Sequence, residues 1–341
     1  MRAAVYVGDR RIAIEDRPVP ELGPHDALVE VSHCGVCGTD LHLVLEGMGP
    51  PDSIGGHEYS GRIAALGPEV CGWALGDAVV GGPGPACGLC RHCREGRPAL
   101  CPGRAALGAG AFQGAFAEYT RIAAESLVRV PEGLPLRTAA LCEPRAVALH
   151  ALTRSGVGPE ARVLVTGAGP LGLLLIAALR ARGVEDVTAS EPAGRRLERA
   201  GRVGARALRR PEELATPPMP FTRVEEPYDA AFECSGNPRA MESALGQLGG
   251  AGTLVLVGTG LRRPKLDHNR ILLNELVVTG AYNYDAGGFE DAVALLRSGA
   301  LPTDLLIEPD DVPLEGLLPA MERLAAGELA GKVLIAPGEA A

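Results

Sequence analysis

Four cysteines fall close together in the run CGLCRHCREGRPALC. Cys87, Cys90, Cys93 and Cys101 follow the spacing CxxCxxCx7C in a segment that is poor in apolar residues. Four thiolates at such short spacing can close a tetrahedral shell around zinc, whereas a ferredoxin-type iron–sulfur run has a shorter last gap. A complete cysteine shell leaves no open coordination position, so we expect a structural zinc in a lobe of about residues 85–103.

A second group of metal-binding side chains is spread over a longer part of the chain. Cys37 lies in HCGVCGTDLH at residues 33–42, His57 lies in GHE, and Glu143 lies in LCEPRAVALH. A mixed shell of S, N and O ligands with one open position is typical of catalytic zinc. These residues therefore predict a metal site that takes part in chemistry.

A glycine-rich turn predicts a dinucleotide site. Gly167, Gly169 and Gly172 form GxGxxG, with Pro170 and Leu171 inside the motif, directly after the apolar run RVLVT and directly before a helix-like segment. In that context the glycines allow a tight turn and let the backbone approach a pyrophosphate at the helix N-terminus.

The expected form of the dinucleotide depends on Glu191. This acid ends the next predicted strand, 19 residues after Gly172, where it can accept hydrogen bonds from an adenosine ribose. Because a carboxylate there would repel the 2′-phosphate of NADP, NAD is favoured. Arg195 and Arg196 follow, and one of them could turn to meet a 2′-phosphate, so NADP stays an alternative.

Two kinds of domain must position these residues. Residues 1 to about 150 contain short alternating segments punctuated by Gly and Pro, which is typical of a β-rich domain. From Arg162 onward, apolar strands alternate with helix-like stretches, which predicts a doubly wound parallel sheet. Amphipathic helices near FEDAVALLRSG and EGLLPAMERLAAGE and the closing strand KVLIAP could pack back on the first domain.

Length and composition exclude several other classes of protein. A chain of 341 residues favours two domains, and a formal net charge of −9 without any Lys/Arg run gives no footprint for nucleic acid or anionic lipid. Glycines and a proline interrupt the longest apolar run, so no membrane span is predicted. The N-terminus lacks the apolar core of a signal peptide, so we expect a cytoplasmic protein whose cysteines are thiols or metal ligands.

Together these motifs resemble those of the zinc-dependent medium-chain alcohol dehydrogenases, most closely the polyol, sorbitol and threonine dehydrogenase branch. The resemblance covers residues 1 to 337 and is carried by GVCGTDLH at 35–42, GHEYSG at 56–61, the cysteine lobe, GAFAEY at 114–119, EP at 143, GAGPLG at 167 and GKVLI at 331. It implies an α/β protein in which residues 1–150 and 288–341 form a GroES-like catalytic domain. Residues 151–287 would form an inserted Rossmann domain, with the active site in the cleft between the two.

The resemblance also implies a role for each residue of the catalytic site. Cys37 and His57 would bind the catalytic zinc, and Asp40 would orient the imidazole of His57. Thr39 would hydrogen-bond the substrate oxygen. His42 would finish a proton relay that runs from the alcohol towards water.

The third protein ligand of this zinc is left open by the sequence. Relatives use either a cysteine or a carboxylate in this region, and the spacing of the polyol branch, 24 residues before Gly167, selects Glu143. Glu58 is a further candidate, because sorbitol-type enzymes can coordinate zinc through the acid that follows the histidine. Both acids rank above Cys142. Lys332, in the family's closing KV, would contact cofactor phosphate.

These parts imply an oxidoreductase with two zinc ions per chain. Zinc lowers the pKa of a bound alcohol, the relay removes its proton, and hydride passes to the nicotinamide. We expect a small-molecule substrate, a secondary alcohol on a polyol, sugar or aminocyclitol that gives the ketone, with an amino alcohol such as threonine second. Phe112, Arg145, Asn283 and Tyr284 come from segments expected to face the cleft, and their polar character favours a hydroxyl-rich ligand.

Two further expectations concern function and assembly. A zinc- and dinucleotide-binding module without turnover is the alternative of a different class, and the intact set of Cys37, Thr39, His42 and His57 argues against it. The resemblance also implies a dimer or tetramer, formed through the edge of the Rossmann sheet near ELVVTGAY.

Overall fold

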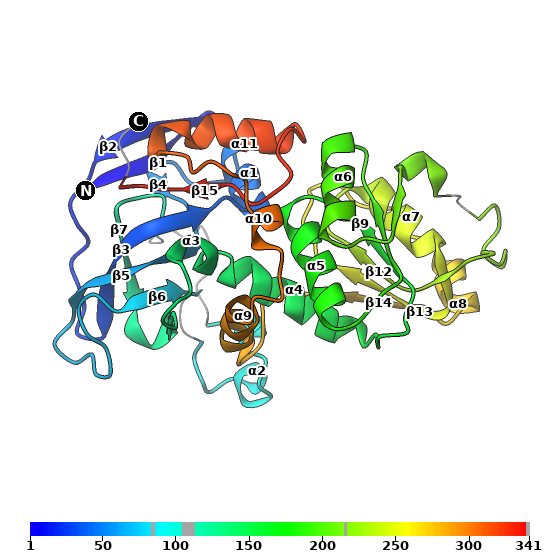
Figure 1. Cartoon of the computed structure of the whole chain (residues 1–341), viewed down its shortest axis with the longest axis horizontal. Coiled ribbons are helices and arrows are strands. Elements are labelled where there is room, and N and C mark those ends of the chain that lie inside the picture. The colour runs from blue at the N-terminus through cyan, green and yellow to red at the C-terminus, as the bar shows by residue number, and fades with distance from the viewer. Residues whose placement is uncertain (83–85, 104–112, 215–216, 339–341) are drawn as a thin grey trace.

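The computed structural model describes residues 1–82, 86–103, 113–214 and 217–338. Its chain forms two halves that lie side by side (Figure 1). The β-rich half holds strands β1–β8 and β15, and the parallel-sheet half holds strands β9–β14. Within the described residues, no helix has both the length and the apolar character that crossing a membrane requires.

The β-rich half contains two antiparallel sheets. Strands β1 and β2 form the N-terminal hairpin that the alternating sequence predicts, and β4 pairs with β1. The larger sheet has the order β15-β3-β5-β6-β8, with β7 also paired to β3. The strands are β1 (Arg2–Gly8), β2 (Arg11–Asp16), β3 (Asp26–Gly35), β4 (Ser53–Ile54), β5 (Glu58–Leu66), β6 (Ala78–Gly81), β7 (Tyr119–Ala123), β8 (Leu127–Arg129) and β15 (Leu334–Ile335).

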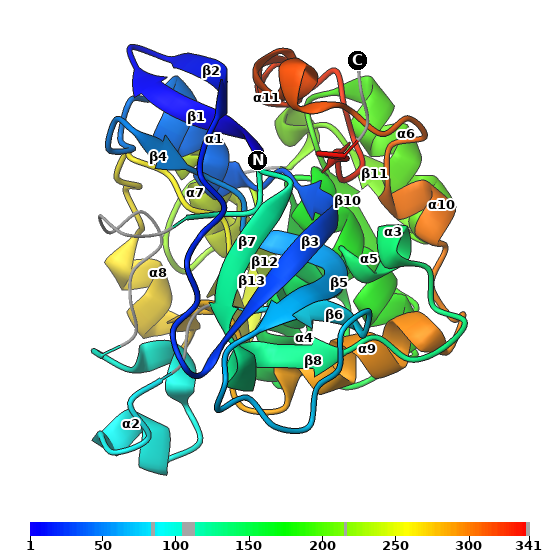
Figure 2. The same cartoon turned by 90° about the vertical axis from the view of Figure 1, so that its left-hand side faces the viewer.

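The end of the chain returns to this half, as the sequence predicts. Strand β15 pairs antiparallel with the last residues of β3, with Leu334 opposite Gly35 and Ile335 opposite Cys34. Ile335 is buried with residues of β1 and β3 in one apolar cluster. Figure 2 looks onto this half and shows the larger sheet crossing it, with the cysteine lobe around α2 projecting below.

The parallel-sheet half is a doubly wound sheet, which confirms the prediction. Its strand order is β11-β10-β9-β12-β13-β14, and every pair is parallel. Side chains alternate across the strand: Val163 and Val165 of β9 pack with α4 and α5, whereas Leu164 packs with α7 on the other face. The strands are β9 (Val163–Thr166), β10 (Val187–Ser190), β11 (Ala207–Arg209), β12 (Tyr228–Glu233), β13 (Leu248–Leu256) and β14 (Val277–Gly280).

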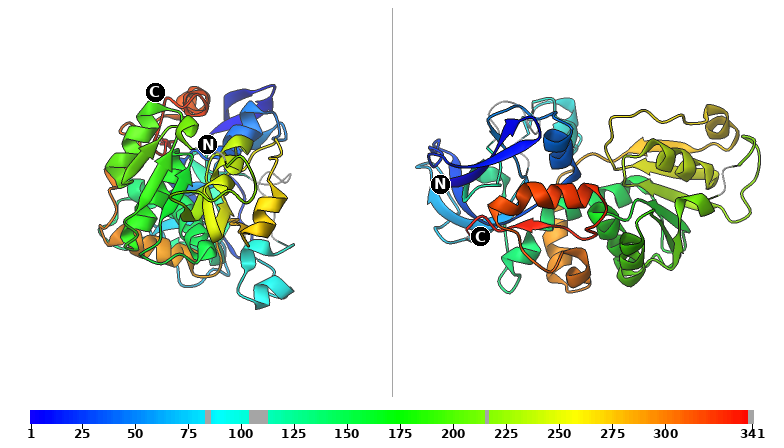
Figure 3. Two further views of the ribbon diagram at one scale, coloured as in Figure 1. Left: turned by 90° about the vertical axis from the view of Figure 1, so that its right-hand side faces the viewer. Right: turned by 90° about the horizontal axis from the view of Figure 1, so that it is seen from above.

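Helices cover both faces of this sheet and join the two halves (Figures 1 and 3). The helices are α1 (Gly38–Leu45), α2 (Arg91–Arg94), α3 (Leu136–Ala139), α4 (Cys142–Ser155), α5 (Pro170–Ala181), α6 (Gly194–Val203), α7 (Pro238–Gly246), α8 (His268–Leu273), α9 (Gly288–Arg297), α10 (Thr303–Leu306) and α11 (Leu317–Ala325). Short 3-10 turns lie at η1 (Pro98–Leu100), η2 (Ala124–Ser126), η3 (Pro211–Glu213) and η4 (Leu314–Gly316).

Helix α4 belongs to both halves. It packs against α5, β13 and β14 on one side and against β5 and α9 on the other. Its core residues share one buried cluster with α5 and with Leu334 of β15. The expected boundary between residues 150 and 151 therefore falls inside a continuous helix, and the division into 1–150 with 288–341 and 151–287 stays a prediction.

Candidate active site

Three of the expected metal ligands meet at one end of the larger antiparallel sheet. Cys37 is the residue before α1, His57 precedes β5, and Glu58 is the first residue of β5. Pairing of β3 with β5 places Gly35 opposite Glu58, which brings the two segments together. One sulfur, one nitrogen and one oxygen from these residues lie within 4.8 Å of one another, a donor set that suits zinc.

Asp40 holds both segments of this group. Its Oδ2 accepts a hydrogen bond from the Cys37 N–H at 2.8 Å, and its Oδ1 accepts one from the Gly56 N–H at 3.4 Å. The same Oδ1 lies 3.8 Å from Nδ1 of His57, which is too far for a hydrogen bond but close enough for charge attraction. Burial raises the pKa of Asp40. Burial would lower the pKa of His57, but Asp40 and Cys37 outweigh it and raise that pKa well above its ordinary value.

Lys332 lies against this group. Its side chain is almost completely buried, and Nζ lies 2.8 and 2.6 Å from the two carboxylate oxygens of Glu58. Nζ also donates to the carbonyl of Val36 at 3.0 Å. Burial opposes the charge, but Glu58 and Cys37 raise the pKa of Lys332, so the ammonium persists at neutral pH. The ammonium neutralises a buried carboxylate, and the expected contact with cofactor phosphate stays a prediction.

The neighbours Cys142 and Glu143 point to different partners. The thiol of Cys142 lies 3.6 Å from the carbonyl oxygen of Phe289, next to α9. Glu143 is in the first turn of α4, and its carboxylate interacts electrostatically with His57 and Glu58. Burial raises the pKa of Glu143 to about 7, and no hydrogen bond or ion pair to it is found within the described residues.

Thr39 and His42 extend from the metal-binding group along α1. The Cys37 thiol lies 3.8 Å from Oγ1 of Thr39. One ring nitrogen of His42 lies 2.8 Å from Glu46, and the other lies 3.2 Å from the carbonyl oxygen of Thr259 in the parallel-sheet half. Since both partners accept hydrogen bonds, a neutral His42 ring can donate to one of them at a time. His42 therefore links the two halves beside the metal-binding group.

The cysteine lobe gathers all four of its predicted ligands. The sulfur atoms of Cys87, Cys90, Cys93 and Cys101 lie within 4.8 Å of one another. Cys90 caps α2 and accepts a hydrogen bond from the Cys93 N–H at 3.4 Å. A hydrogen bond from the Cys87 backbone lowers the pKa of Cys101 to about 6, which favours the thiolate form that metals bind. Residue 85, at the start of the expected lobe, lies outside the described residues.

The glycine-rich turn joins β9 to α5 at the carboxyl edge of the parallel sheet. Gly167 has a φ of +87°, and a Cβ at Gly172 would lie 2.0 Å from the Gly167 carbonyl oxygen. Gly169 is the N-cap of α5, and Pro170 and Leu171 are the first two residues of the helix. The fixed φ of proline suits this first helical position. The turn thus leaves the N-terminus of α5 open to a pyrophosphate.

Glu191 and Arg196 flank this turn. The two carboxylate oxygens of Glu191 accept hydrogen bonds from the Ala168 and Ala193 N–H groups at 2.9 and 3.0 Å. The guanidinium of Arg196 donates to the carbonyls of Leu329 at 2.8 Å and Leu324 at 2.6 Å. Both side chains therefore already have protein partners beside the turn.

The glycines of this turn offer a matched pair of variants. Gly169 has φ −74°, and an added Cβ would meet only the Arg196 guanidinium, at 3.8 Å. We therefore expect Gly169→Ala to keep the melting temperature within about 3 °C of wild type while weakening ADP-ribose binding about tenfold, because its methyl group faces the pyrophosphate. Gly172→Ala should lower the melting temperature as well, since its Cβ meets backbone. Calorimetry of both variants checks this, and unchanged ADP-ribose affinity in Gly169→Ala would contradict the assignment.

Sequence reasoning missed the loops that follow β12 and β13. A Cβ at Gly236 would lie 1.8 Å from the Thr259 carbonyl oxygen, and one at Gly258 would lie 2.4 Å from the Gly236 nitrogen, so the loops touch through glycines. Both lie at the carboxyl edge, where ligands of such sheets bind, and Thr259 contacts His42. A glycine within three residues of the end of successive parallel strands was the available signal.

The residues expected to line a polar pocket are placed differently. Arg145 is fully buried, donates to the Leu174 carbonyl and has its pKa lowered to about 10 by desolvation. Tyr284 is buried against Phe289, with ring centroids 4.8 Å apart. The expectation that both face the cleft is therefore wrong, because both complete the core between α4, α5 and α9. Phe112 lies outside the described residues, and Asn283 is half-buried with a φ of +51°.

Comparison with known proteins identifies the family. Residues 23–132 match the alcohol dehydrogenase GroES-like domain, and residues 170–298 match the zinc-binding dehydrogenase domain. The chain is 34% identical to sorbitol dehydrogenase from Bacillus subtilis over 95% of this chain and 93% of the relative. It is 36% identical to L-threonine 3-dehydrogenase from Pectobacterium atrosepticum over 83% and 80%, respectively.

A solved structure agrees with these matches. Galactitol-1-phosphate dehydrogenase from Escherichia coli superimposes with a TM-score of 0.88 and 28% identity, covering 99% of this chain and 100% of that one. The agreement extends over both halves and the segments that join them. The chain therefore belongs to the zinc-dependent medium-chain dehydrogenases, in the branch that contains the sorbitol and threonine dehydrogenases.

Proposed function

We propose that this enzyme transfers hydride from a secondary alcohol to NAD and forms the ketone. The observation that carries the proposal is the position of the metal-binding group of Cys37, His57 and Glu58. Through His42 and Thr259 it lies directly across from the dinucleotide-binding edge of the parallel sheet. A metal-binding group and a dinucleotide site that meet in this way support hydride transfer between an alcohol and a nicotinamide.

The charges of the site fit a zinc ion. Cys37 as thiolate and Glu143 as carboxylate would together balance a divalent cation, while Glu58 is already balanced by Lys332. Without a cation, burial raises the pKa of Glu143 to about 7, although the charges of His57 and Lys332 lower it. We assign Cys37, His57 and Glu143 as the protein ligands on the spacing that the family resemblance implies, with Glu58, whose carboxylate lies in the group with Cys37 and His57, as an alternative ligand.

The side chains around the metal would orient groups and move a proton. When bound, zinc supplies a Lewis acid that lowers the pKa of the alcohol, and NAD supplies the hydride acceptor. Asp40 fixes the backbone on either side of the site through Cys37 and Gly56. Thr39, next to the Cys37 sulfur, would hydrogen-bond the alcohol oxygen. His42 would pass the proton from this hydroxyl towards solvent.

NAD is the proposed dinucleotide. Glu191 stands beside the glycine-rich turn, and its carboxylate would accept hydrogen bonds from the ribose hydroxyls and repel a 2′-phosphate. Arg196, which could have met that phosphate, is already held by the carbonyls of Leu324 and Leu329. Steady-state kinetics with each dinucleotide should give a kcat/KM for NAD at least about tenfold above that for NADP.

A polyol or sugar alcohol is the proposed substrate class, with an amino alcohol second. The support comes from the sorbitol, threonine and galactitol-1-phosphate dehydrogenases that the chain resembles. The test is a panel of sorbitol, other polyols, L-threonine, 2,3-butanediol and ethanol with NAD. A preference for secondary hydroxyls supports the proposal, and turnover of simple primary alcohols alone would contradict it.

The cysteine lobe is proposed to hold a second, structural zinc. Its four sulfurs fill a tetrahedral shell and leave no position for substrate. Metal analysis should therefore find two zinc ions per chain, and Cys93→Ser should lose one of them and lower the melting temperature. Full retention of zinc and stability in Cys93→Ser would remove this assignment. We also propose a cytoplasmic location, since reducing conditions keep both cysteine groups available to metal.

A homodimer or tetramer is proposed to form at the edge of the parallel sheet. Strand β14 is the edge strand, and Val277 on it is 49% exposed. Leu272, Leu273 and Tyr282, on α8 and just after β14, are more exposed still, and a group of exposed apolar side chains at a sheet edge suits an interface. Sedimentation should show a dimer or larger assembly that Val277→Lys weakens. A wild-type monomer at micromolar concentration would contradict the proposal.

A further inference from the structure

Glu308 occupies the connection from α10 to α11, where the β-rich half meets the parallel-sheet half. Its side chain is only 6% exposed although it carries a charge. Its contacts reach both halves of the molecule.

The carboxylate of Glu308 receives donors from two separate parts of the chain. Arg199 of α6 donates to its Oε1 at 2.6 Å, and Arg195 of the same helix lies 3.6 Å from its Oε2. The backbone N–H groups of Ala330 and Gly331 donate to Oε1 at 3.0 and 2.7 Å. Burial opposes ionisation, but these hydrogen bonds and the arginine charges lower the pKa of Glu308, so it is a carboxylate at neutral pH.

The segment that Glu308 holds carries Lys332 to the metal-binding group. The Glu308 N–H donates to the Lys332 carbonyl at 2.9 Å, and the Lys332 N–H donates to the Leu306 carbonyl at 2.8 Å. A Cβ at Gly331 would lie 2.5 Å from Nη1 of Arg199 and 3.0 Å from the Ile307 backbone, so the Arg199 side chain of α6 and the Glu308 segment both lie close to the residue directly before Lys332. The Lys332 ammonium in turn pairs with Glu58.

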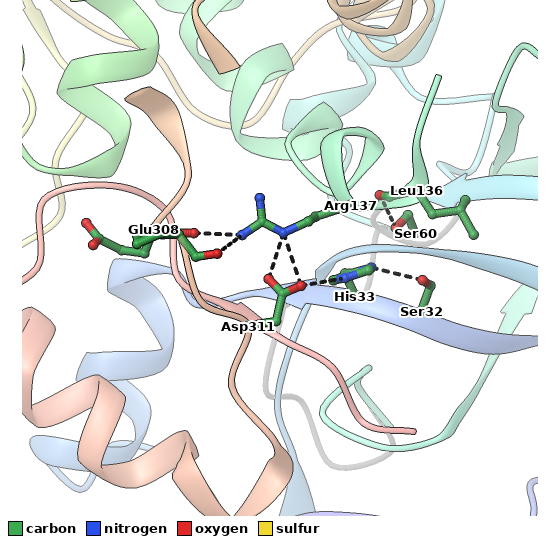
Figure 4. Close-up of polar contacts among 8 residues, drawn as sticks. Ser32, His33, Ser60, Leu136, Arg137, Glu308 and Asp311 are labelled. Carbon is green, nitrogen blue, oxygen red and sulfur yellow. Dashed lines mark hydrogen bonds and ion pairs between the residues drawn. The ribbon is translucent and has the colours of Figure 1, made fainter. Parts of the chain in front are cut away.

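The other side of the Glu308 segment is fixed to the β-rich half (Figure 4). Arg137 of α3 donates to the carbonyls of Glu308 at 2.7 Å and Pro309 at 3.1 Å, and its Nε donates to both carboxylate oxygens of Asp311. Asp311 also lies 3.1 Å from Nε2 of His33 on β3. The segment around Glu308 is therefore bound to the β-rich half, which carries the metal-binding group. A displacement of α6 would be transmitted through this segment to that half.

We propose that Glu308 is a positioning residue that couples the dinucleotide-binding helix α6 to Lys332 and, through Lys332 and Glu58, to the metal-binding group. This inference rests on the proposed function. Helix α6 begins three residues after Glu191, next to the expected ribose site, whereas the alcohol would react on the β-rich half. Hydride transfer needs the nicotinamide and the alcohol in near contact, and a misplacement of about 1 Å can cost roughly 10²-fold in rate. Glu308 would set that distance by fixing the orientation of one half on the other.

The test compares Glu308→Gln with Glu328→Gln. The first variant removes the charge that Arg195 and Arg199 meet but keeps an oxygen for the Ala330 and Gly331 N–H groups. The control removes a carboxylate in the same C-terminal region whose partner, Arg323, is exposed like itself. ADP-ribose is the probe, because it carries the part of NAD that binds the parallel-sheet half but lacks the nicotinamide.

Two readouts separate coupling from plain stability. Hydrogen exchange of the peptide covering residues 328–335 should slow when ADP-ribose binds wild type or Glu328→Gln, and this response should vanish in Glu308→Gln. Affinity for ADP-ribose should stay within about twofold of wild type in both variants, while kcat with NAD falls roughly 10- to 100-fold in Glu308→Gln alone. Arg199→Met, which removes one arginine partner of Glu308, should likewise abolish the exchange response and lower kcat. In the double variant of Glu308→Gln and Arg199→Met, the loss of kcat should be smaller than the two single losses combined.

The outcomes are distinguishable from failure of the proposed function. A response of residues 328–335 that persists in both Glu308→Gln and Arg199→Met, with unchanged kcat, would overturn the coupling. If Glu308→Gln does not fold, Arg199→Met decides alone. A wild type without turnover on any alcohol contradicts the proposed function, while the exchange response still decides the coupling. A wild type that does not bind ADP-ribose contradicts both.

Discussion

Replacing Cys37 by serine should remove one zinc ion per chain and lower kcat/KM by roughly 10³-fold or more, which corresponds to several kcal/mol of Lewis-acid stabilisation. Serine is isosteric but offers a hydroxyl where zinc prefers a thiolate. Cys37 lies in one group with His57 and Glu58 and caps α1 only through its backbone and Asp40. The fold should therefore survive, and metal analysis with kinetics checks both losses.

Cys142→Ala is the matched control for this experiment. Cys142 is also a buried thiol, but it faces the carbonyl of Phe289 and lies outside the metal-binding group. It should keep both zinc ions and most of the activity, whereas Glu143→Gln should behave like Cys37→Ser. Full activity in Cys37→Ser, or loss of zinc in Cys142→Ala with retention in Glu143→Gln, would reverse the ligand assignment.

Replacing Lys332 by methionine should cost roughly 3–5 kcal/mol of folding stability, because breaking a buried ion pair leaves an uncompensated charge. Lys332 and Glu58 have side chains only 4% and 1% exposed. A Cβ at Gly35 would lie 3.1 Å from Cδ of Lys332, so the surroundings leave little room for rearrangement. Chemical denaturation of the apoprotein measures the loss.

The double variant Glu58→Gln with Lys332→Met separates charge from packing. It should recover most of the stability lost in Lys332→Met, because it leaves neither a buried carboxylate at position 58 nor a buried ammonium at position 332. Since the folded-state pKa of Lys332 is raised, its contribution is complete below the ordinary lysine pKa and is lost only as pH rises through the folded value. A single variant as stable as wild type at pH 7 would show that the pair is not the source of stability.

Much of the fold follows from local patterns in the sequence. The alternation of apolar strands and helices after Arg162 determines the parallel sheet, because Val163, Leu164 and Val165 must each be buried on one of its two faces. The glycine-rich turn and the cysteine lobe are equally local, since their residues lie within a few positions of one another. These features were predictable because short spacing limits the geometry.

Contacts between distant segments could not be predicted in the same way. The contact of the Lys332 ammonium with Glu58 was not predicted, because it depends on the pairing of β15 with β3. Arg145 and Tyr284 looked like pocket residues, but the packing of α4 against α5 and α9 buries them. Polar residue type alone carries no information on which face of a helix or loop the tertiary structure covers. The loops at Gly236 and Thr259 were missed because their contact joins segments that lie after two different strands.

The most direct test of the central claim is NADH formation from a secondary alcohol by one enzyme preparation before chelation, after chelation and after return of Zn²⁺. We expect NAD-dependent turnover that disappears with the catalytic zinc and returns when zinc is restored. The Cys37→Ser variant should show no recovery in the same assay. Undiminished turnover by metal-free enzyme, or no turnover of any secondary alcohol by the zinc-loaded enzyme, would contradict it.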